Sequence, residues 1–170
     1  LNITSVNDAP TAADKSIDVL EDGSKVFAAS DFGFTDSDNN ALAAVIITTL
    51  PTAGTLKLNG TDVTAGQSVT KADIDAGKLV FAPAANANGA NYASIGFKVQ
   101  DDGGITHGGV DTSASAHTIT LNVTPVNDAP VLTNTSTLAY TENATAQAIN
   151  TLLNVNDVDN TTLTSATVKI

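Results

Sequence analysis

The hydropathy pattern of residues 15–123 consists of short stretches rich in β-branched residues, in which apolar and polar side chains often alternate. Alternation with a period of two is the pattern of a strand with one buried face. Turn residues such as Asn59-Gly60 and Asp102-Gly103-Gly104 separate these stretches. The pattern therefore predicts strands at Lys15–Leu20, Lys25–Ala28, Ala43–Thr49, Thr55–Leu58, Gln67–Thr70, Lys78–Ala82, Tyr92–Gln100 and His117–Val123.

No segment has the pattern of a long amphipathic helix, and only Thr70–Gly77 has the marks of a helical turn. It begins with a threonine, which can cap a helix, and it ends with a glycine. About seven short strands separated by turns predict an all-β fold, an antiparallel Ig-like β-sandwich. Its core is expected to hold small aliphatic residues and two phenylalanines, namely Ile17, Val19, Val26, Val45, Ile47, Leu56, Leu58, Val80, Phe81, Ile95, Phe97, Val99, Ile119, Leu121 and Val123.

The chain contains an internal repeat. The decapeptide LNITSVNDAP at residues 1–10 returns at residues 121–130 as LNVTPVNDAP, with eight of ten positions identical. An offset of 120 residues is too long for a solenoid and fits a whole domain. We therefore expect residues 1–9 to end a preceding repeat and its linker, residues 10–126 to form one complete repeat, and residues 127–170 to hold a linker and the incomplete start of the next repeat.

Acidic residues return together with this linker. The two glutamates of the chain, Glu21 and Glu142, occupy equivalent places at an offset of 121. An Asp-x-Asp pair returns at the same offset, because Asp36 and Asp38 correspond to Asp157 and Asp159. These acids thus recur at equivalent positions of the repeat, which is not expected of acids scattered over a surface.

The charge of the chain is strongly one-sided. It has 18 acidic residues against seven basic ones, all of them lysine, and a formal net charge of −11. Nucleic-acid binding is excluded because it needs clustered Lys and Arg. Attachment to an anionic membrane surface is disfavoured for the same reason, and no apolar stretch is long enough for direct membrane insertion. High negative charge opposes compaction unless cations offset it.

Cysteine is absent, so neither disulfides nor thiolate metal sites contribute to this chain. Methionine is absent too, while Asp, Asn, Thr and Gly are abundant. This composition is typical of a secreted bacterial surface protein, and we expect an extracellular location at the cell surface.

The acids are expected to gather at the ends of the sandwich, because successive turns alternate between its two poles. The N-terminal pole, where the chain enters, is expected to hold Asn7, Asp8, Asp36, Asp38 and Asp101. The C-terminal pole and the start of the next repeat are expected to supply the other candidate metal ligands, namely Glu21, Asn127, Asp128, Asp157, Asp159 and Glu142.

Clusters of carboxylate and carbonyl oxygens are the ligands of Ca²⁺, which takes six to eight oxygens at about 2.3–2.6 Å. Mg²⁺ demands a stricter octahedron and keeps more of its waters, so it is the second choice. Zinc would need His or Cys, and His107 and His117 have no ligand spacing. An isolated Asp-x-Asp in a loop is more often plain turn chemistry. Recurrence in register at the repeat junctions favours Ca²⁺ as the cofactor.

These motifs resemble those of cadherins. The linker Thr124–Pro130 is similar to the Asn-Asp linker that joins cadherin repeats. Glu142-Asn143 resembles the cadherin Pro-Glu-Asn turn without its proline, and Glu21-Asp22 lies at the same point. Further resemblances to the cadherin Asp-Ala-Asp motif and to the acid that ends a late strand are found at Asp36-Ser37-Asp38, Asp157-Val158-Asp159 and Gln100-Asp101.

The fuller resemblance is to the bacterial cadherin-like tandem repeats of giant RTX-type surface adhesins. It covers essentially the whole chain and includes the hairpin sequence at Leu50–Gly60 and the stretch at Phe81–Gly89. One departure concerns the cadherin Asp-Arg-Glu motif, because the matching loop, Ala84–Asn91, is rich in asparagine and contains no acid. The resemblance therefore implies a cadherin-like sandwich with fewer bound ions at each junction.

Three classes of function remain to be compared. The first is a non-enzymatic extender repeat of an adhesin, in which Ca²⁺ stiffens the junctions with neighbouring repeats of the same chain. The second is an adhesion module that binds a carbohydrate or host-protein ligand, although the five Phe and two Tyr offer few aromatic platforms. The third is an enzyme, and no catalytic spacing such as Gly-x-Ser-x-Gly occurs. We therefore expect an extender and no enzyme.

Overall fold

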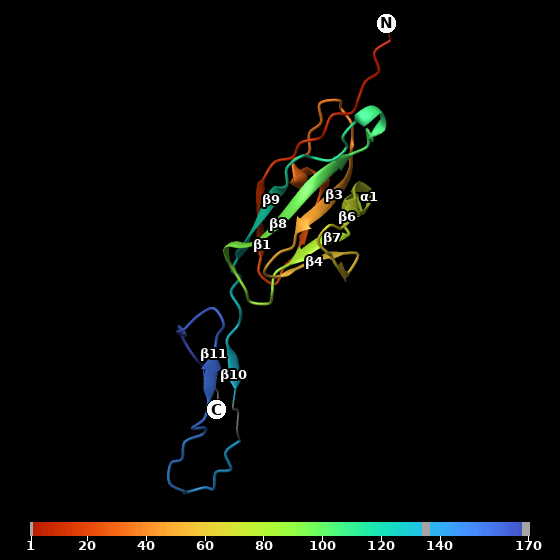
Figure 1. Ribbon diagram of the computed structural model, residues 1–170. Coiled ribbons are helices and arrows are strands. Elements are labelled where there is room, and N and C mark those ends of the chain that lie inside the picture. Colours follow the sequence, from red (N-terminus) through yellow and green to blue (C-terminus); the bar gives the residue numbers. More distant parts are fainter. Residues whose placement is uncertain (1, 134–136, 168–170) are drawn as a thin grey trace. The chain divides into compact units, whose positions relative to one another are not determined.

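The computed structural model describes residues 2–133 and 137–167, and the chain divides into two compact units, Leu1–Val126 and Asn127–Ile170. The first unit is a β-sandwich (Figure 1). One sheet has the order β1-β9-β8-β3-β6 and the other the order β2-β7-β4-β5. Its strands are β1 Lys15–Leu20, β2 Lys25–Val26, β3 Leu42–Thr49, β4 Thr55–Leu58, β5 Thr61–Asp62, β6 Ser68–Thr70, β7 Leu79–Ala82, β8 Gly89–Asp101 and β9 His117–Thr124.

Short helices occupy three of the connections. The 3-10 helix η1 spans Ala29–Phe32, the α-helix α1 spans Lys71–Asp75, and a second 3-10 turn, η2, spans Thr106–Gly108. The expected helical turn is confirmed at α1, where the Thr70 hydroxyl accepts a hydrogen bond from the Asp73 N–H at 3.1 Å. No helix in the described part of the chain is long and apolar enough to cross a membrane.

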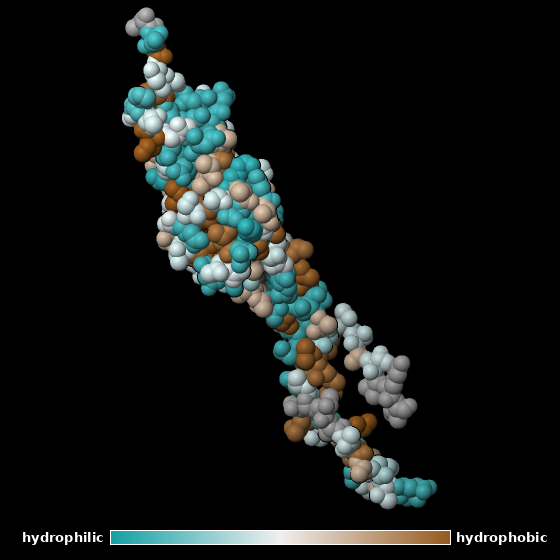
Figure 2. All heavy atoms as spheres, turned by 90° about the vertical axis from the view of Figure 1, so that its right-hand side faces the viewer, coloured by the Kyte–Doolittle hydropathy of each residue, from teal (hydrophilic) through white to brown (hydrophobic). Residues whose placement is uncertain are grey.

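One contiguous core lies between the two sheets, and its members come from both of them. Most of the expected core residues are buried, because each strand turns every second side chain inward. Val26 is a wrong prediction: it is 49% exposed, while its neighbour Phe27 enters the core. Leu58 and Val80 are only partly buried. Outward-facing side chains leave a mostly hydrophilic surface over this unit in the view of Figure 2.

The edge strand β1 pairs with β9 in parallel, from Lys15 with Ile119 to Leu20 with Thr124. The other pairings of the first unit are antiparallel. Both strands therefore run from the N-terminal pole to the C-terminal pole. The pair continues beyond the strand ends, because the Glu21 N–H donates to the Thr124 carbonyl at 2.9 Å. This register places Glu21 beside the exit of the chain from the sandwich.

The described residues of the second unit contain one antiparallel pair, β10 Val131–Thr133 with β11 Asn154–Asn156. The pairing of Val131 with Asn156 repeats the isolated bridge between Thr11 and Thr35 in the first unit, at offsets of 120 and 121. The exposed apolar side chains of its described residues include Val131, Leu132, Ile149, Leu152 and Leu153. Figure 2 shows hydrophobic residues on the surface of this part of the chain as brown spheres.

Candidate functional site

The N-terminal pole of the first unit gathers the linker and the Asp36–Asn40 loop. The bridge between Thr11 and Thr35 aligns the two segments. Beyond it, the Asp8 N–H donates to Asp38 Oδ2 at 2.7 Å. Within the loop, the N–H groups of Asp38 and Asn40 both donate to Asp36 Oδ1 at 2.9 Å. Asp36 thus closes a tight Asx turn, and the Asp38 carboxylate accepts a hydrogen bond from the linker backbone.

Asp101 joins this group from the end of β8. It is only 3% exposed. Its Oδ1 accepts hydrogen bonds from Asn7 Nδ2 at 3.0 Å and from the Gly103 N–H at 2.8 Å. Asn7 also contacts the loop through its own Oδ1, to which Asn40 Nδ2 donates. The five residues predicted for this pole, Asn7, Asp8, Asp36, Asp38 and Asp101, are therefore linked into one network.

Two carboxylate oxygens of this network have no protein partner. Oδ2 of Asp36 and Oδ2 of Asp101 are buried, and neither has a hydrogen-bond partner within the described ranges 2–133 and 137–167. Leaving a buried acceptor unsatisfied costs about 1–3 kcal/mol, and more for a charged group. Buried polar atoms without partners are rare in native proteins, so each one calls for a physical explanation, such as a bound ion or water.

The first unit contains another buried acid, Asp31 on η1, and this acid does have cationic partners. Lys15 Nζ lies 2.7 Å from Asp31 Oδ1 and Lys25 Nζ lies 2.9 Å from Asp31 Oδ2. Burial would raise the pKa of Asp31, but the hydrogen bond from the Ala28 N–H and the two ammonium groups outweigh it and lower this pKa. No ion pair connects Asp36, Asp101 or Glu21 with a lysine or histidine of the described residues.

The C-terminal pole contains the buried carboxylate of Glu21, which is 2% exposed. Its Oε1 accepts a hydrogen bond from the Val126 N–H at 2.6 Å, and its Oε2 accepts one from Asn88 Nδ2 at 2.8 Å. Close by, Asp22 Oδ1 accepts from the Asn86 N–H at 3.1 Å. Sequence analysis missed Asn88, although it placed this residue in the asparagine-rich loop that lacks an acid.

The second unit repeats the network of the N-terminal pole with its own residues. The Asp128 N–H donates to Asp159 Oδ2 at 2.5 Å. The N–H groups of Asp159 and Asn160 donate to Asp157 Oδ1 at 2.9 and 2.8 Å. Asn160 Nδ2 donates to Asn127 Oδ1 at 3.1 Å, as Asn40 does to Asn7. The two loops form similar bonds, although the closing N–H comes four positions after Asp36 and three positions after Asp157.

Glu142 is not part of that network. It is exposed on a turn in which the Ala144 N–H donates to the Thr141 carbonyl at 3.1 Å. Because β10 and β11 are antiparallel, the segment that connects them leaves one end of the pair, while Asp128 and Asp157 lie beyond the other end. Within the second unit, Glu142 is therefore separated from the other predicted ligands.

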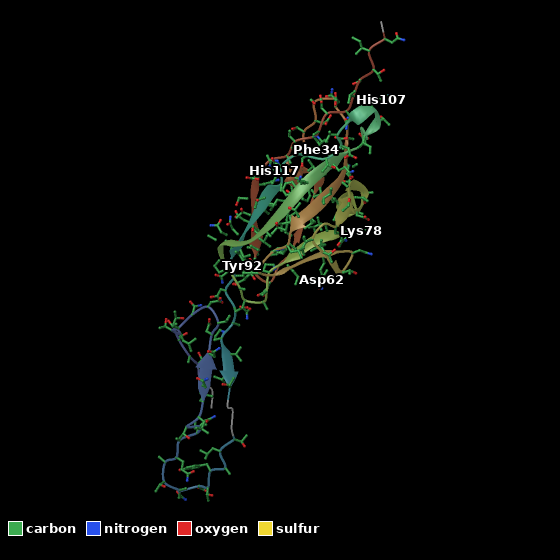
Figure 3. The ribbon with its side chains drawn as sticks, viewed as in Figure 1. Phe34, Asp62, Lys78, Tyr92, His107 and His117 are labelled. Atoms are coloured by element: carbon green, nitrogen blue, oxygen red, sulfur yellow. The ribbon has the colours of Figure 1, made fainter. Side chains whose placement is uncertain are left out.

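The described side chains of the poles do not by themselves form a complete metal site. Within the part of the chain that the structure describes, no three His, Cys, Asp or Glu side chains are grouped as one metal site. Figure 3 shows His107 near the N-terminal end of the first unit and His117 apart from it on β9. An ion at the N-terminal pole would be held by carboxylate, amide and carbonyl oxygens, which is the ligand chemistry of Ca²⁺.

Comparison with known proteins identifies the family. The sequence model of the family described as Cadherin-like matches residues 10–121, which make up more than half of the chain. The chain therefore belongs to the cadherin-like family, whose domains are non-catalytic structural repeats of adhesion proteins. No curated protein and no solved structure matches the chain. The prediction of a cadherin-like sandwich is confirmed, whereas the RTX adhesin context stays a prediction.

Proposed function

We propose that this chain is a calcium-binding extender repeat of a bacterial surface adhesin, in which Ca²⁺ stiffens the junctions between neighbouring repeats. The observation that carries the proposal is the pair of buried, unpartnered oxygens, Oδ2 of Asp36 and Oδ2 of Asp101. Two lysines pair with the buried Asp31, but no lysine of the described residues pairs with Asp36 or Asp101. A divalent cation at this pole would supply a partner for such an oxygen and offset the negative charge.

The residues that would hold the ion at the N-terminal pole are Asp36 and Asp101 through their unpartnered oxygens, with Asp38 and the linker residues Asn7 and Asp8 around them. When bound, the ion supplies positive charge that screens the mutual repulsion of these acids. The chain's own hydrogen bonds do the positioning, because Asp38 holds the linker backbone and Asp36 closes its loop. A ligand present at about 100 times its Kd would add about 2.7 kcal/mol to the stability of the folded state.

The link to a neighbouring repeat follows from the position of Glu21. Its Oε1 binds the N–H of Val126, the residue immediately before the next linker. The buried carboxylate of one repeat is thus attached to the start of the linker that leads to the following repeat. Asn127, Asp128, Asp157 and Asp159 then repeat the pole network. We infer that Ca²⁺ bound by such groups restricts the linker between successive repeats of an array.

Thermal unfolding of the 170-residue chain in calcium and in chelator tests the ion site. We expect calcium to raise the Tm of the wild type, and we expect Asp36→Asn and Asp101→Asn each to remove most of that increase. Asp62→Asn is the matched control, because the Asp62 side chain is exposed and its Oδ1 lies 3.6 Å from Lys57 Nζ. An equal calcium-dependent increase in the wild type and in both pole variants would overturn the proposal.

Small-angle scattering on the same protein tests the extender role separately. With calcium we expect a longer and better defined maximum dimension, because a coupled junction restricts the linker. In chelator the distribution of distances should broaden as the junction flexes. Identical distance distributions in calcium and in chelator would contradict the stiffening, even if the ion binds.

A further inference from the structure

The asparagine-rich loop at the C-terminal pole contains an Asn-Gly pair, Asn88-Gly89. An asparagine followed by glycine is prone to cyclise, because glycine lacks the side chain that would hinder attack by its backbone nitrogen on the preceding amide. Gly89 is the first residue of β8 and pairs with Val123, and a Cβ built on it would meet no atom within 4 Å, so no neighbouring side chain crowds this end of the strand. Asn88 is exposed and lies outside the strands, directly before β8.

The Asn88 amide contacts a buried acid, so a chemical change of this amide affects that acid. Its Nδ2 donates to Oε2 of the buried Glu21 at 2.8 Å. The loop around it is anchored at two other points, where the Ala84 N–H donates to the Tyr92 hydroxyl and the Asn86 N–H donates to Asp22, both at 3.1 Å. Figure 3 shows Tyr92 at the end of the first unit opposite to His107. A change at position 88 therefore acts directly on the Glu21 carboxylate.

We propose that Asn88 is a self-modification site, whose spontaneous deamidation places a second carboxylate beside Glu21 at the C-terminal pole. The Gly89 nitrogen loses its proton to solvent and forms a bond to Cγ of Asn88, and the Cγ–Nδ2 bond breaks with release of ammonia. Water then opens the succinimide at either carbonyl. The products are an aspartyl or isoaspartyl residue and ammonium, and one water is consumed.

The new carboxylate changes the electrostatics of the pole. Glu21 Oε2 loses its hydrogen-bond donor and gains a like charge nearby, and both changes disfavour the folded state. A divalent cation between the two carboxylates would reverse the sign of this interaction. Deamidation thereby replaces an amide–carboxylate hydrogen bond with a two-carboxylate site, so the calcium response grows with the fraction of deamidated protein. This ion step rests on the proposed calcium function, whereas the deamidation does not.

The chain provides an internal control in its other Asn-Gly pair, Asn59-Gly60. This pair forms the two-residue turn between β4 and β5, with φ values of 50° and 80°. The Asn59 N–H donates to the Lys78 carbonyl at 2.9 Å. No hydrogen bond in the described residues joins the Asn59 side chain to a carboxylate. Asn59→Asp therefore adds the same charge at a place where it has no buried acid to repel.

Two measurements test the proposal. In the first, peptide mapping by mass spectrometry follows the purified chain during warm, mildly alkaline incubation, and we expect the mass gain of deamidation at position 88. In the second, Asn88→Asp mimics the product, and we expect its Tm in chelator to fall by about 3–6 °C below that of the wild type. Asn59→Asp is expected to stay within about 1 °C, since exposed substitutions are nearly neutral.

Calcium separates this proposal from the proposed function. We expect calcium to raise the Tm of Asn88→Asp by more than it raises that of the wild type. If calcium affects neither protein, the calcium function fails, while the deamidation and the chelator result still stand. The proposal itself is overturned if position 88 keeps its amide under conditions that convert position 59. It is also overturned if Asn88→Asp and Asn59→Asp unfold at the same temperature in chelator.

Discussion

The side-chain amide of Asn7 donates a hydrogen bond to Oδ1 of Asp101 at 3.0 Å, although the two residues lie 94 positions apart in the sequence. The same nitrogen lies within 3.2 Å of the Gly104 carbonyl and 2.9 Å of the Val110 carbonyl. The linker is thus fastened to the end of β8 and to the loop that follows it. A cation on the free oxygen of Asp101 would act on the residue that holds the linker in place.

Replacement of Gly103 by alanine should disturb this attachment. A Cβ at position 103 would lie 2.1 Å from Asn7 Oδ1 and 2.2 Å from Asn40 Nδ2, so both amides would have to move. We expect Gly103→Ala to destabilise the first unit by about 1–3 kcal/mol, as overpacking does. Urea unfolding measures the loss, and limited proteolysis should show faster cleavage in the linker.

Gly104→Ala is the control for that variant. Gly104 has a φ of +77°, but open space surrounds its missing side chain. Its replacement strains the backbone without pushing on Asn7, so stability should fall while linker cleavage stays close to the wild-type rate. Equal linker cleavage in the two variants would show that crowding at Asn7 is not what holds the linker.

The ion pairs of Asp31 with Lys15 and Lys25 predict that the stability of the fold depends on pH. Because the pKa of Asp31 is lowered in the folded protein, ionised Asp31 contributes stability above its unfolded value of 3.8. That contribution disappears as the pH falls through the lower folded value. We expect the free-energy difference between wild type and Asp31→Asn to be constant near neutral pH and to shrink below pH 3.8. Urea unfolding across this pH range measures that free-energy difference. A difference independent of pH would contradict a stabilising role of the Asp31 ion pairs.

Glu21→Gln separates charge from shape at the C-terminal pole. The variant keeps the size of the side chain and can still accept from the Val126 N–H, and its NH2 group can donate to the Asn88 amide oxygen once the Asn88 amide turns over. In chelator we expect its Tm to equal or exceed that of the wild type, because a buried charge no longer has to be desolvated. In calcium we expect a smaller increase than in the wild type. Asp22→Asn, an exposed change in the same turn, should keep the full rise in Tm caused by calcium. A full rise in Tm in Glu21→Gln as well would exclude Glu21 from the ion site.

Much of the fold can be predicted from the sequence, because period-two alternation is a local property. β1 and β4 have the predicted bounds, and α1 lies within the predicted turn. Alternation alone does not decide which neighbour turns inward, so Val26 was placed in the core where Phe27 belongs. Phe27 packs against Phe32, and Phe32 packs against Phe97 at a centroid distance of 5.1 Å. These contacts depend on long-range packing that no local window contains.

The acids at the poles could be predicted because they recur in register. Their partners could not be predicted, since Asn88 reaches Glu21 across 67 positions and the two lysines of Asp31 come from different sheets. Nothing in the local sequence around Asp31 distinguishes it from surface acids such as Asp62. Of the buried acids Glu21, Asp31 and Asp101, only Asp31 forms ion pairs with lysines of the described residues, and this difference is visible only in three dimensions.

Calorimetric titration of the chelator-treated chain with calcium tests the central claim most directly, because it reports ion binding without reference to stability. We predict saturable binding in the wild type and in Asp62→Asn, weakened at least tenfold by Asp36→Asn or Asp101→Asn, which corresponds to about 1.4 kcal/mol. Unchanged titrations in both pole variants, or no heat of binding in the wild type, would contradict a calcium site at the poles of this repeat.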